Sequence, residues 1–140
     1  MRKFFLSIFL VFAALSFTFA SSSDLEEALG LLNDGQTDQA MEIVKEKLKN
    51  NPKSSDNHMA MGLIQLEKND YAGAKESLEA ALELDRKIVA AHYMLAMIYE
   101  KEGDVQKAID KWQKIFKYSK NATLRSLADK HIRQLKGELK

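Results

Sequence analysis

Apolar and polar positions recur along this chain at a fixed interval. Residues 69–82 read NDYAGAKESLEAAL and residues 103–116 read GDVQKAIDKWQKIF, with an aspartate in second place, an alanine in sixth, and large apolar residues in tenth and fourteenth. Residues 35–48, 34 positions before 69–82, read GQTDQAMEIVKEKL and keep the alanine and the closing apolar residue. Apolar residues three or four positions apart lie on one face of a helix. The pattern therefore predicts three copies of one helical unit.

Helix is expected over the whole chain after residue 20. Ala, Leu, Glu, Lys, Met and Gln dominate there, with one proline and no run of β-branched residues. Gly35, Asn69 and Gly103 lie in the middle of successive units, and Gly and Asn are the residues that accept a positive φ at a helix C-terminus. Each unit is therefore expected to be two antiparallel helices joined by a tight turn. The expected units are residues 21–54, 55–88 and 89–122.

Small residues mark the places where the two helices of a unit are expected to cross. Gly62 and Ala96 occupy matching positions in the first helices of the second and third units, and Ala74 and Ala108 do so in the second helices. Side chains at the contact set how closely two helices approach. These four positions are therefore expected to be buried.

Together these features resemble the tetratricopeptide repeat (TPR), a helix–turn–helix of 34 residues. The first unit is a degenerate copy, with Asp24 and Glu27 where larger residues are usual, as a terminal repeat tolerates. Residues 123–140 repeat the spacing of a first helix, and no second helix follows. The resemblance implies an all-α, right-handed solenoid of three repeats with a C-terminal capping helix. The signature positions in the second and third units are His58, Met61, Gly62, Gln65, Ala74, Leu78 and Ala81, and His92, Leu95, Ala96, Tyr99, Ala108 and Trp112.

The resemblance also implies a concave groove lined by the first helices. Family members that grip a terminal carboxylate use lysine, arginine and asparagine there, whereas this chain has mostly leucine and methionine. An apolar groove suits an amphipathic helix or a hydrophobic peptide. The alternative is that these residues only complete the packing between neighbouring first helices. The implied groove residues are Leu25, Leu29, Leu32, Met59, Leu63, Leu66, Tyr93, Met97, Glu100 and Lys101.

No set of residues in the chain predicts catalysis. There is no cysteine, no glycine-rich phosphate loop and no HExxH spacing. His58 and His92 lie one repeat apart where the family places a packing residue, and His131 falls where a large residue is usual, so all three are expected to be structural. We expect no enzyme activity, cofactor, metal or small-molecule substrate. The formal charge of +1, or −1 without Arg2 and Lys3, gives no reason to expect nucleic acid or an anionic membrane as partner.

Residues 1–20 have the features of a secretory signal peptide. A basic start is followed by FFLSIFLVFAALSFTFA and then by Ser21, Ser22 and Ser23. Cleavage is expected after Ala20 or after Ser22. The alternative, an uncleaved membrane anchor, would need a longer and purer apolar stretch, and it is the one route by which a membrane would be involved.

The predicted function is therefore an exported module, periplasmic or secreted, that binds a protein or peptide partner as an adaptor or scaffold. A second hypothesis is a structural protein that forms homo-oligomers through the groove or the capping helix.

Overall fold

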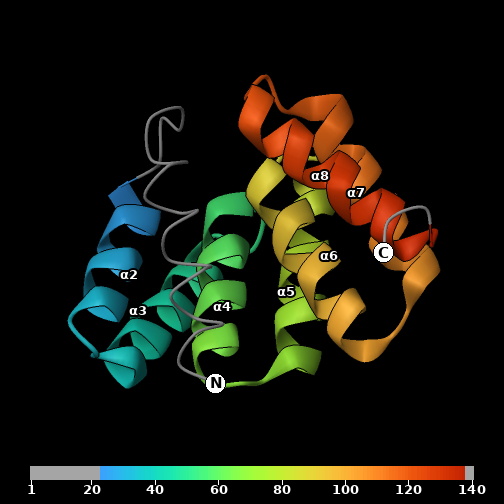
Figure 1. The fold of residues 1–140 in the computed structure, drawn as a ribbon. Coiled ribbons are helices and arrows are strands. Elements are labelled where there is room, and N and C mark those ends of the chain that lie inside the picture. The colour runs from blue at the N-terminus through green and yellow to red at the C-terminus, as the bar shows by residue number, and fades with distance from the viewer. Residues whose placement is uncertain (1–22, 138–140) are drawn as a thin grey trace.

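The computed structural model describes residues 23–137, which form seven helices and no strands (Figure 1). The predicted signal peptide and both cleavage positions lie outside these residues. Within them, no helix has the length and apolar character that crossing a membrane requires. The helices are α2 (Ser23–Asn33), α3 (Thr37–Asn50), α4 (Ser55–Glu67), α5 (Tyr71–Leu84), α6 (Val89–Glu102), α7 (Val105–Tyr118) and α8 (Ala122–Leu135).

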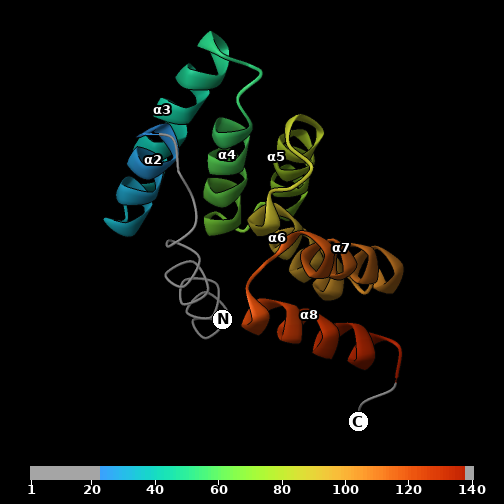
Figure 2. The same ribbon diagram turned by 90° about the horizontal axis from the view of Figure 1, so that it is seen from above.

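Three antiparallel helix pairs stack along a curve, and a single helix closes one end. Each expected unit contains one pair: α2 with α3, α4 with α5, and α6 with α7. Seen from above, α2, α4 and α6 lie on the inner side of the curve and α3, α5 and α7 on the outer side (Figure 2). Helix α8 packs on α7 and begins at Ala122, one residue before the expected boundary. The predicted solenoid of three helix–turn–helix repeats with a capping helix is confirmed.

The turn within each pair is built the same way three times. Gly35, Asn69 and Gly103 have φ of 74°, 60° and 76°, as their positions predict. The next residue donates its N–H to a carbonyl five residues back, the closing bond of a Schellman turn. These bonds are Gln36 to Leu31 at 2.8 Å, Asp70 to Gln65 at 2.8 Å and Asp104 to Tyr99 at 2.9 Å.

Side-chain caps then start the following helices. The carboxylate of Asp70 accepts from the N–H of Gly73 at 2.9 Å, and that of Asp104 accepts from the N–H of Lys107 at 3.2 Å. Asn121 does the same for α8, accepting from the N–H of Leu124 at 3.0 Å. Each satisfies an N–H that the first turn of a helix leaves without a partner.

The small residues allow the close approach that the sequence predicts. A Cβ added to Gly62 would lie 2.8 Å from Cγ of Leu78, so nothing larger than hydrogen fits there without a shift. Ala74, Ala96 and Ala108 are fully buried. Phe116 departs from the apolar pattern: it is 44% exposed, with the guanidinium of Arg125 over its ring at 4.4 Å from the centroid.

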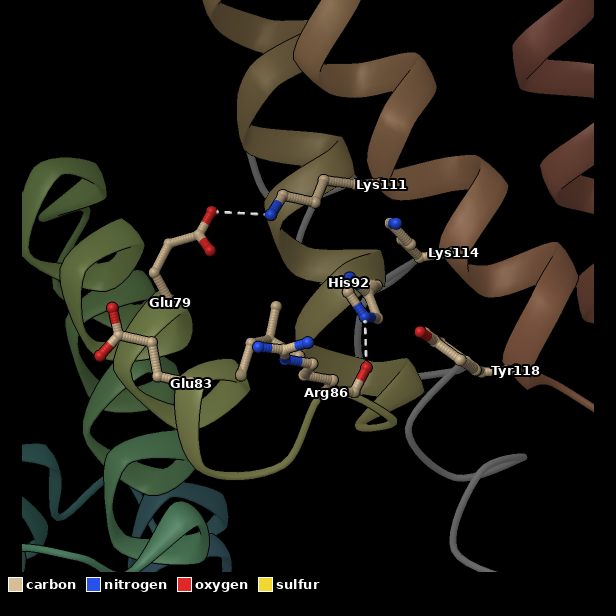
Figure 3. A pocket seen from close by; sticks show the side chains of 8 residues that line it. Glu79, Glu83, Arg86, His92, Lys111, Lys114 and Tyr118 are labelled. Carbon is tan, nitrogen blue, oxygen red and sulfur yellow. Dashed lines mark hydrogen bonds and ion pairs between the residues drawn. The ribbon is translucent and has the colours of Figure 1, made fainter.

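Two histidines on first helices hydrogen-bond the segments that connect successive units. The Nε2 of His58 donates to the carbonyl of Pro52, and the Nε2 of His92 donates to the carbonyl of Arg86, both at 2.9 Å. The second of these bonds is visible in Figure 3. Equivalent bonds one repeat apart give these residues the structural role that their spacing predicts.

Candidate protein-binding groove

All ten residues predicted for the groove lie on the inner helices. Leu25, Leu29 and Leu32 are on α2. Met59, Leu63 and Leu66 are on α4, and Tyr93, Met97, Glu100 and Lys101 are on α6. Because α2, α4 and α6 share the inner side of the curve (Figure 2), these residues come from neighbouring surfaces of three units. Their burial differs widely.

Half of the ten are buried. Met59, Leu63 and Leu66 are 3%, 8% and 7% exposed. Leu25 is also buried and belongs to the same apolar cluster as these three, while Tyr93 is buried in a second cluster with Trp112. These side chains therefore contribute to folding, and a ligand could meet them only as the floor of a groove.

The remaining apolar residues, Leu29, Leu32 and Met97, are partly exposed, and we refer to them as the rim residues of the predicted groove. Leu29 and Leu32 pack at the edge of the larger apolar cluster, and Met97 packs at the edge of the cluster around Tyr93 and Trp112. A half-buried apolar side chain keeps solvent-accessible apolar surface, and burying that surface against a partner favours binding. The rim residues are therefore the groove positions from which binding free energy can be gained.

Glu100 is engaged within the chain. One carboxylate oxygen of Glu100 accepts from the indole Nε1 of Trp112 and from Nδ1 of His131 on α8, the latter at 2.8 Å. The His131 ring also stacks on Trp112, with centroids 4.2 Å apart. Glu100 thus joins α6, α7 and the capping helix.

Lys101 is engaged as well. Its ammonium hydrogen-bonds the hydroxyl of Tyr71 on α5 and lies 3.8 Å from the centroid of that ring. At the previous junction, Lys68 at the end of α4 reaches Asp38 of α3 at 2.6 Å. In both cases a lysine at the end of a first helix is tied to the start of the preceding second helix.

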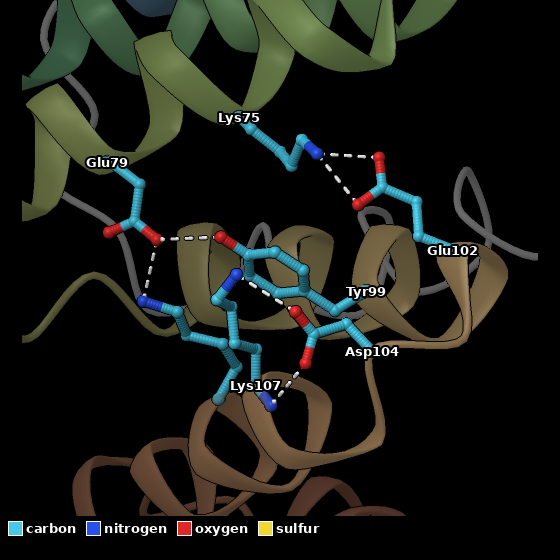
Figure 4. Close-up of polar contacts among 7 residues, drawn as sticks. Lys75, Glu79, Tyr99, Glu102, Asp104 and Lys107 are labelled. Carbon is cyan, nitrogen blue, oxygen red and sulfur yellow. Dashed lines mark hydrogen bonds and ion pairs between the residues drawn. The ribbon is translucent and has the colours of Figure 1, made fainter.

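A further polar network fixes the second unit against the third on the outer side (Figure 4). Lys75 donates to both carboxylate oxygens of Glu102 at 2.6 and 2.7 Å, and Lys111 pairs with Glu79 at 2.8 Å. The hydroxyl of Tyr99 reaches Glu79 at 3.5 Å, and burial raises the pKa of that hydroxyl. These contacts join α5 to α6 and α7 and so hold the second unit against the third.

Sequence reasoning missed the roles of Glu100, Lys101 and Lys75. Their partners lie 31, 30 and 27 positions away. Alternating lysine and glutamate on a helix is ordinary solvated surface, so no local signal distinguishes them. Among the described residues, no group of three or more histidine, aspartate or glutamate side chains could hold a metal ion.

Comparison with known proteins agrees with this architecture. Residues 59–121 match the tetratricopeptide repeat family. A comparison with curated proteins found no match.

Several solved structures share the fold. The type III secretion chaperone SycD of Yersinia enterocolitica, in complex with a peptide of the translocator YopD, is 15% identical with a TM-score of 0.73, over 86% of this chain and 98% of that one. PcrH in complex with the chaperone-binding region of PopD is 14% identical with a TM-score of 0.68, over 87% and 98%. The TPR domain of Arabidopsis OM64 is 18% identical with a TM-score of 0.69, over 86% and 97%.

At these identities the structures establish the fold alone. Residues 59–121, in the second and third units, match the tetratricopeptide repeat family, and the helices of the chain take the solenoid arrangement of these structures.

Proposed function

We propose that this chain is an exported protein-interaction module whose inner helices bind an apolar segment of a partner protein. The observation that carries the proposal is the presence of partly exposed apolar residues on the inner helices to either side of α4, with Leu29 and Leu32 on α2 and Met97 on α6. Support comes from SycD and PcrH, which share the fold: SycD was solved with a peptide of the translocator YopD bound, and PcrH with the chaperone-binding region of PopD.

The partner segment would lie across the inner side and contact the rim. Met97 suits such a role because its thioether adapts to irregular shapes. Glu100 and Lys101 would contribute only at the edge, since both are already held by contacts within the chain. Leu63 would form part of the floor, so a charge placed there would test folding rather than binding.

A photo-crosslinking amino acid placed at position 29 or 97 tests this geometry. Crosslinks to one partner from both positions, in the native compartment, would support an inner binding surface. Positions 76 and 113, exposed on the outer helices α5 and α7, serve as controls. Equal crosslinking from the outer positions would place the binding surface elsewhere.

Once a partner is identified, paired substitutions measure the contribution of the rim. Leu29→Glu with Met97→Glu should leave the helical circular dichroism unchanged. Losing one interface anchor costs about 2 kcal/mol, or roughly 30-fold in Kd. Glu76→Lys with Gln113→Glu is the matched control. Lys75 and Lys107 would be poor controls because they pair with Glu102 and Asp104.

Sedimentation of the chain without its leader tests the alternative of homo-oligomers formed through the groove or α8. A monomer at micromolar concentration would contradict self-association. The absence of enzyme activity, cofactor and small-molecule substrate stays a prediction.

A further inference from the structure

The charges of the chain are distributed unevenly along the solenoid. Residues 21–88, which make up the first two units, contain 14 acidic and 8 basic residues, a formal charge of −6. Residues 117–140, which contain the end of α7 and all of α8, have seven basic and two acidic residues, a formal charge of +5. The near-zero charge of the whole chain therefore conceals an acidic end and a basic end.

The basic end is formed around the helix that closes the stack. Helix α8 packs on α7 and reaches α6 through His131, and no other described helix lies against its far side (Figure 2). Leu124 and Ala128 are buried toward the third unit, whereas the charged residues of α8 are exposed. The exposed basic residues of this end are Lys117, Lys120, Arg125, Lys130, Arg133 and Lys136.

Most of these cations are not paired within the chain. The lysines nearer the start of α7 do have carboxylate partners, for example Lys114, whose ammonium lies 3.9 Å from Asp110. By contrast, four lysines at the basic end form no ion pair within residues 23–137, namely Lys117, Lys120, Lys130 and Lys136.

The carboxylates near this surface are too few to balance it. Asp129 lies one helical turn from both Arg125 and Arg133 on α8, and Glu100 lies beneath α8, where it binds His131. These two carboxylates against six exposed bases leave a charge of +4. The overall charge of the chain gives no reason to expect an anionic membrane as partner, but this distribution of charge does.

An exposed aromatic ring lies within the basic surface. Phe116 on α7 is 44% exposed, and the guanidinium of Arg125 lies over its ring. Leu84 on α5 is exposed to the same extent, at 43%, but its neighbours in the chain are Glu83 and Asp85. Phe116 therefore combines apolar exposure with unneutralised positive charge, and Leu84 does not.

This combination selects the kind of partner. A protein carboxylate is recognised best where donors converge on it, whereas the cations here are spread over the outside of α8 and the end of α7. An anionic bilayer presents negative charge over a plane, so it attracts spread cations without any fixed geometry, and each lysine or arginine near its surface raises binding about fivefold. Phenylalanine among basic residues is typical of segments that lie at the headgroup boundary. Under the proposed export, the chain would meet a bilayer surface rather than nucleic acid.

We propose that α8 and the end of α7 form a docking surface for an anionic lipid bilayer, with the cations against the headgroups and Phe116 at the boundary with the acyl chains. The acidic first two units are repelled by the same bilayer, so the stack binds by its basic end. The inner helices α2 and α4 stay accessible to a protein partner. Because the two surfaces use different residues, either can fail its test without affecting the other.

Flotation with lipid vesicles tests this surface. The processed chain is used, because the apolar leader would bind any bilayer. The probes are vesicles of phosphatidylcholine alone and vesicles of phosphatidylcholine mixed with phosphatidylglycerol, which is anionic. We expect binding to the mixed vesicles and a loss of binding between about 10 and about 150 mM salt, because the Debye length falls from about 30 to about 8 Å. Equal binding to the neutral vesicles, or binding that does not respond to salt, would overturn the proposal.

Two triple variants with the same net charge locate the surface. The first removes three lysines of the basic end and should lower binding to the anionic vesicles about hundredfold. The second removes three exposed lysines from the first two units, none of which forms an ion pair with a described residue, and should stay within about threefold of the wild type. An equal loss in both would show that only net charge matters and would overturn the proposal. The first variant is Lys120→Gln, Lys130→Gln and Lys136→Gln, and the second is Lys49→Gln, Lys53→Gln and Lys87→Gln.

A second pair of variants tests the aromatic contact. Phe116→Ser should weaken binding about fivefold, whereas Leu84→Ser should leave it unchanged. Both side chains are exposed, so the helical circular dichroism of both variants should match the wild type. Equal effects at the two positions would contradict insertion of Phe116.

Two soluble polyanions distinguish a bilayer from other acidic partners. Poly-glutamate stands for an acidic protein and duplex DNA for a nucleic acid. We expect both to bind far more weakly than the anionic vesicles at the same salt concentration. If either binds as tightly as the vesicles and loses binding in the first triple variant, the surface belongs to that class of partner and the bilayer proposal is overturned.

Discussion

At the scale of single residues, the close approach of paired helices depends on a few positions without a large side chain. Ala74 and Ala108 are fully buried in the second helices of the second and third units. Gly62 faces Leu78 so closely that a methyl group would clash. A packed interior accommodates even one added methylene poorly, so these positions report directly on the packing.

Replacing Ala74 or Ala108 with leucine should force the paired helices apart. We expect a loss of about 1–3 kcal/mol in the free energy of unfolding, measured by urea denaturation. Ala72 is two residues from Ala74 but exposed, and Ala72→Leu should stay within roughly 0.5 kcal/mol of the wild type. Equal losses at positions 72 and 74 would show that we have assigned these positions to the wrong faces of α5.

His92 should make stability depend on pH. Burial lowers its pKa below the ordinary value of 6.5, so the unfolded chain takes up this proton at a higher pH than the folded chain. The unfolded state then binds more protons between the two pKa values, and stability falls as pH drops through about 6.5. The loss ends once the pH is below the folded pKa.

His92→Gln should reduce this dependence, since the glutamine amide can still donate to the Arg86 carbonyl and does not titrate. The comparison is made by denaturation in buffers between about pH 5 and 8. Asp38 and Asp104 have pKa values lowered below 3.8 by hydrogen bonds to Lys68 and Lys107, so their effect falls at more acidic pH. An unchanged slope in the variant would assign the pH dependence to another group.

At the scale of elements, α8 is held to the third unit by buried apolar contacts and by one carboxylate. Leu124 and Ala128 are buried against Tyr93, Trp112 and Ile115. Glu100 then accepts from both Trp112 and His131. Because Trp112 is fully buried, its indole N–H depends on that carboxylate for a hydrogen-bond partner.

Glu100→Ala should therefore loosen the capping helix. Leaving a buried donor without a partner costs about 1–3 kcal/mol, and amide hydrogen exchange should rise in α8 more than in α4. Glu100→Gln keeps an acceptor for one of the two donors and should have a smaller effect. Glu76→Ala, at an exposed position on α5, controls for the loss of a surface charge. Uniform exchange changes across all helices would argue against a local role.

At the scale of the whole molecule, the stack is held by apolar packing and by polar side-chain contacts that recur between units. The chain has no cysteine, so no disulfide contributes in an oxidising compartment. Lys68 to Asp38 and Lys101 to Tyr71 join successive units at the same end of the helices. Such exposed pairs each contribute little, about 0–1 kcal/mol, so the apolar contacts between units supply most of the stability.

Export is a prediction at this scale. Mass spectrometry of the protein from its native host should find a chain that begins at Ser21 or Ser23, because a signal peptidase would remove the apolar leader. A membrane-embedded chain that retains Met1 would contradict export as a cleaved protein and favour an anchor.

The sequence by itself determined the repeat and the position of each element. The 34-residue interval, the turn residues Gly35, Asn69 and Gly103, and the small residues at the crossings all act locally or within one helix pair. Backbone conformation at a turn and close approach between adjacent helices depend on residues near in sequence, so they can be inferred from it. The ten groove residues were implied by the resemblance to the TPR family, and they lie on the inner helices.

Only the tertiary structure decided which inner residues are available to a partner. Leu63 and Met97 look alike in the sequence, yet one is buried and the other partly exposed. Glu100 and Lys101 look free, yet His131 and Tyr71 engage them from 31 and 30 positions away. Residues of α5, α6 and α7 likewise come together around His92. The physical reason is the rotation from one unit to the next, which brings distant side chains together and which the repeat interval does not specify.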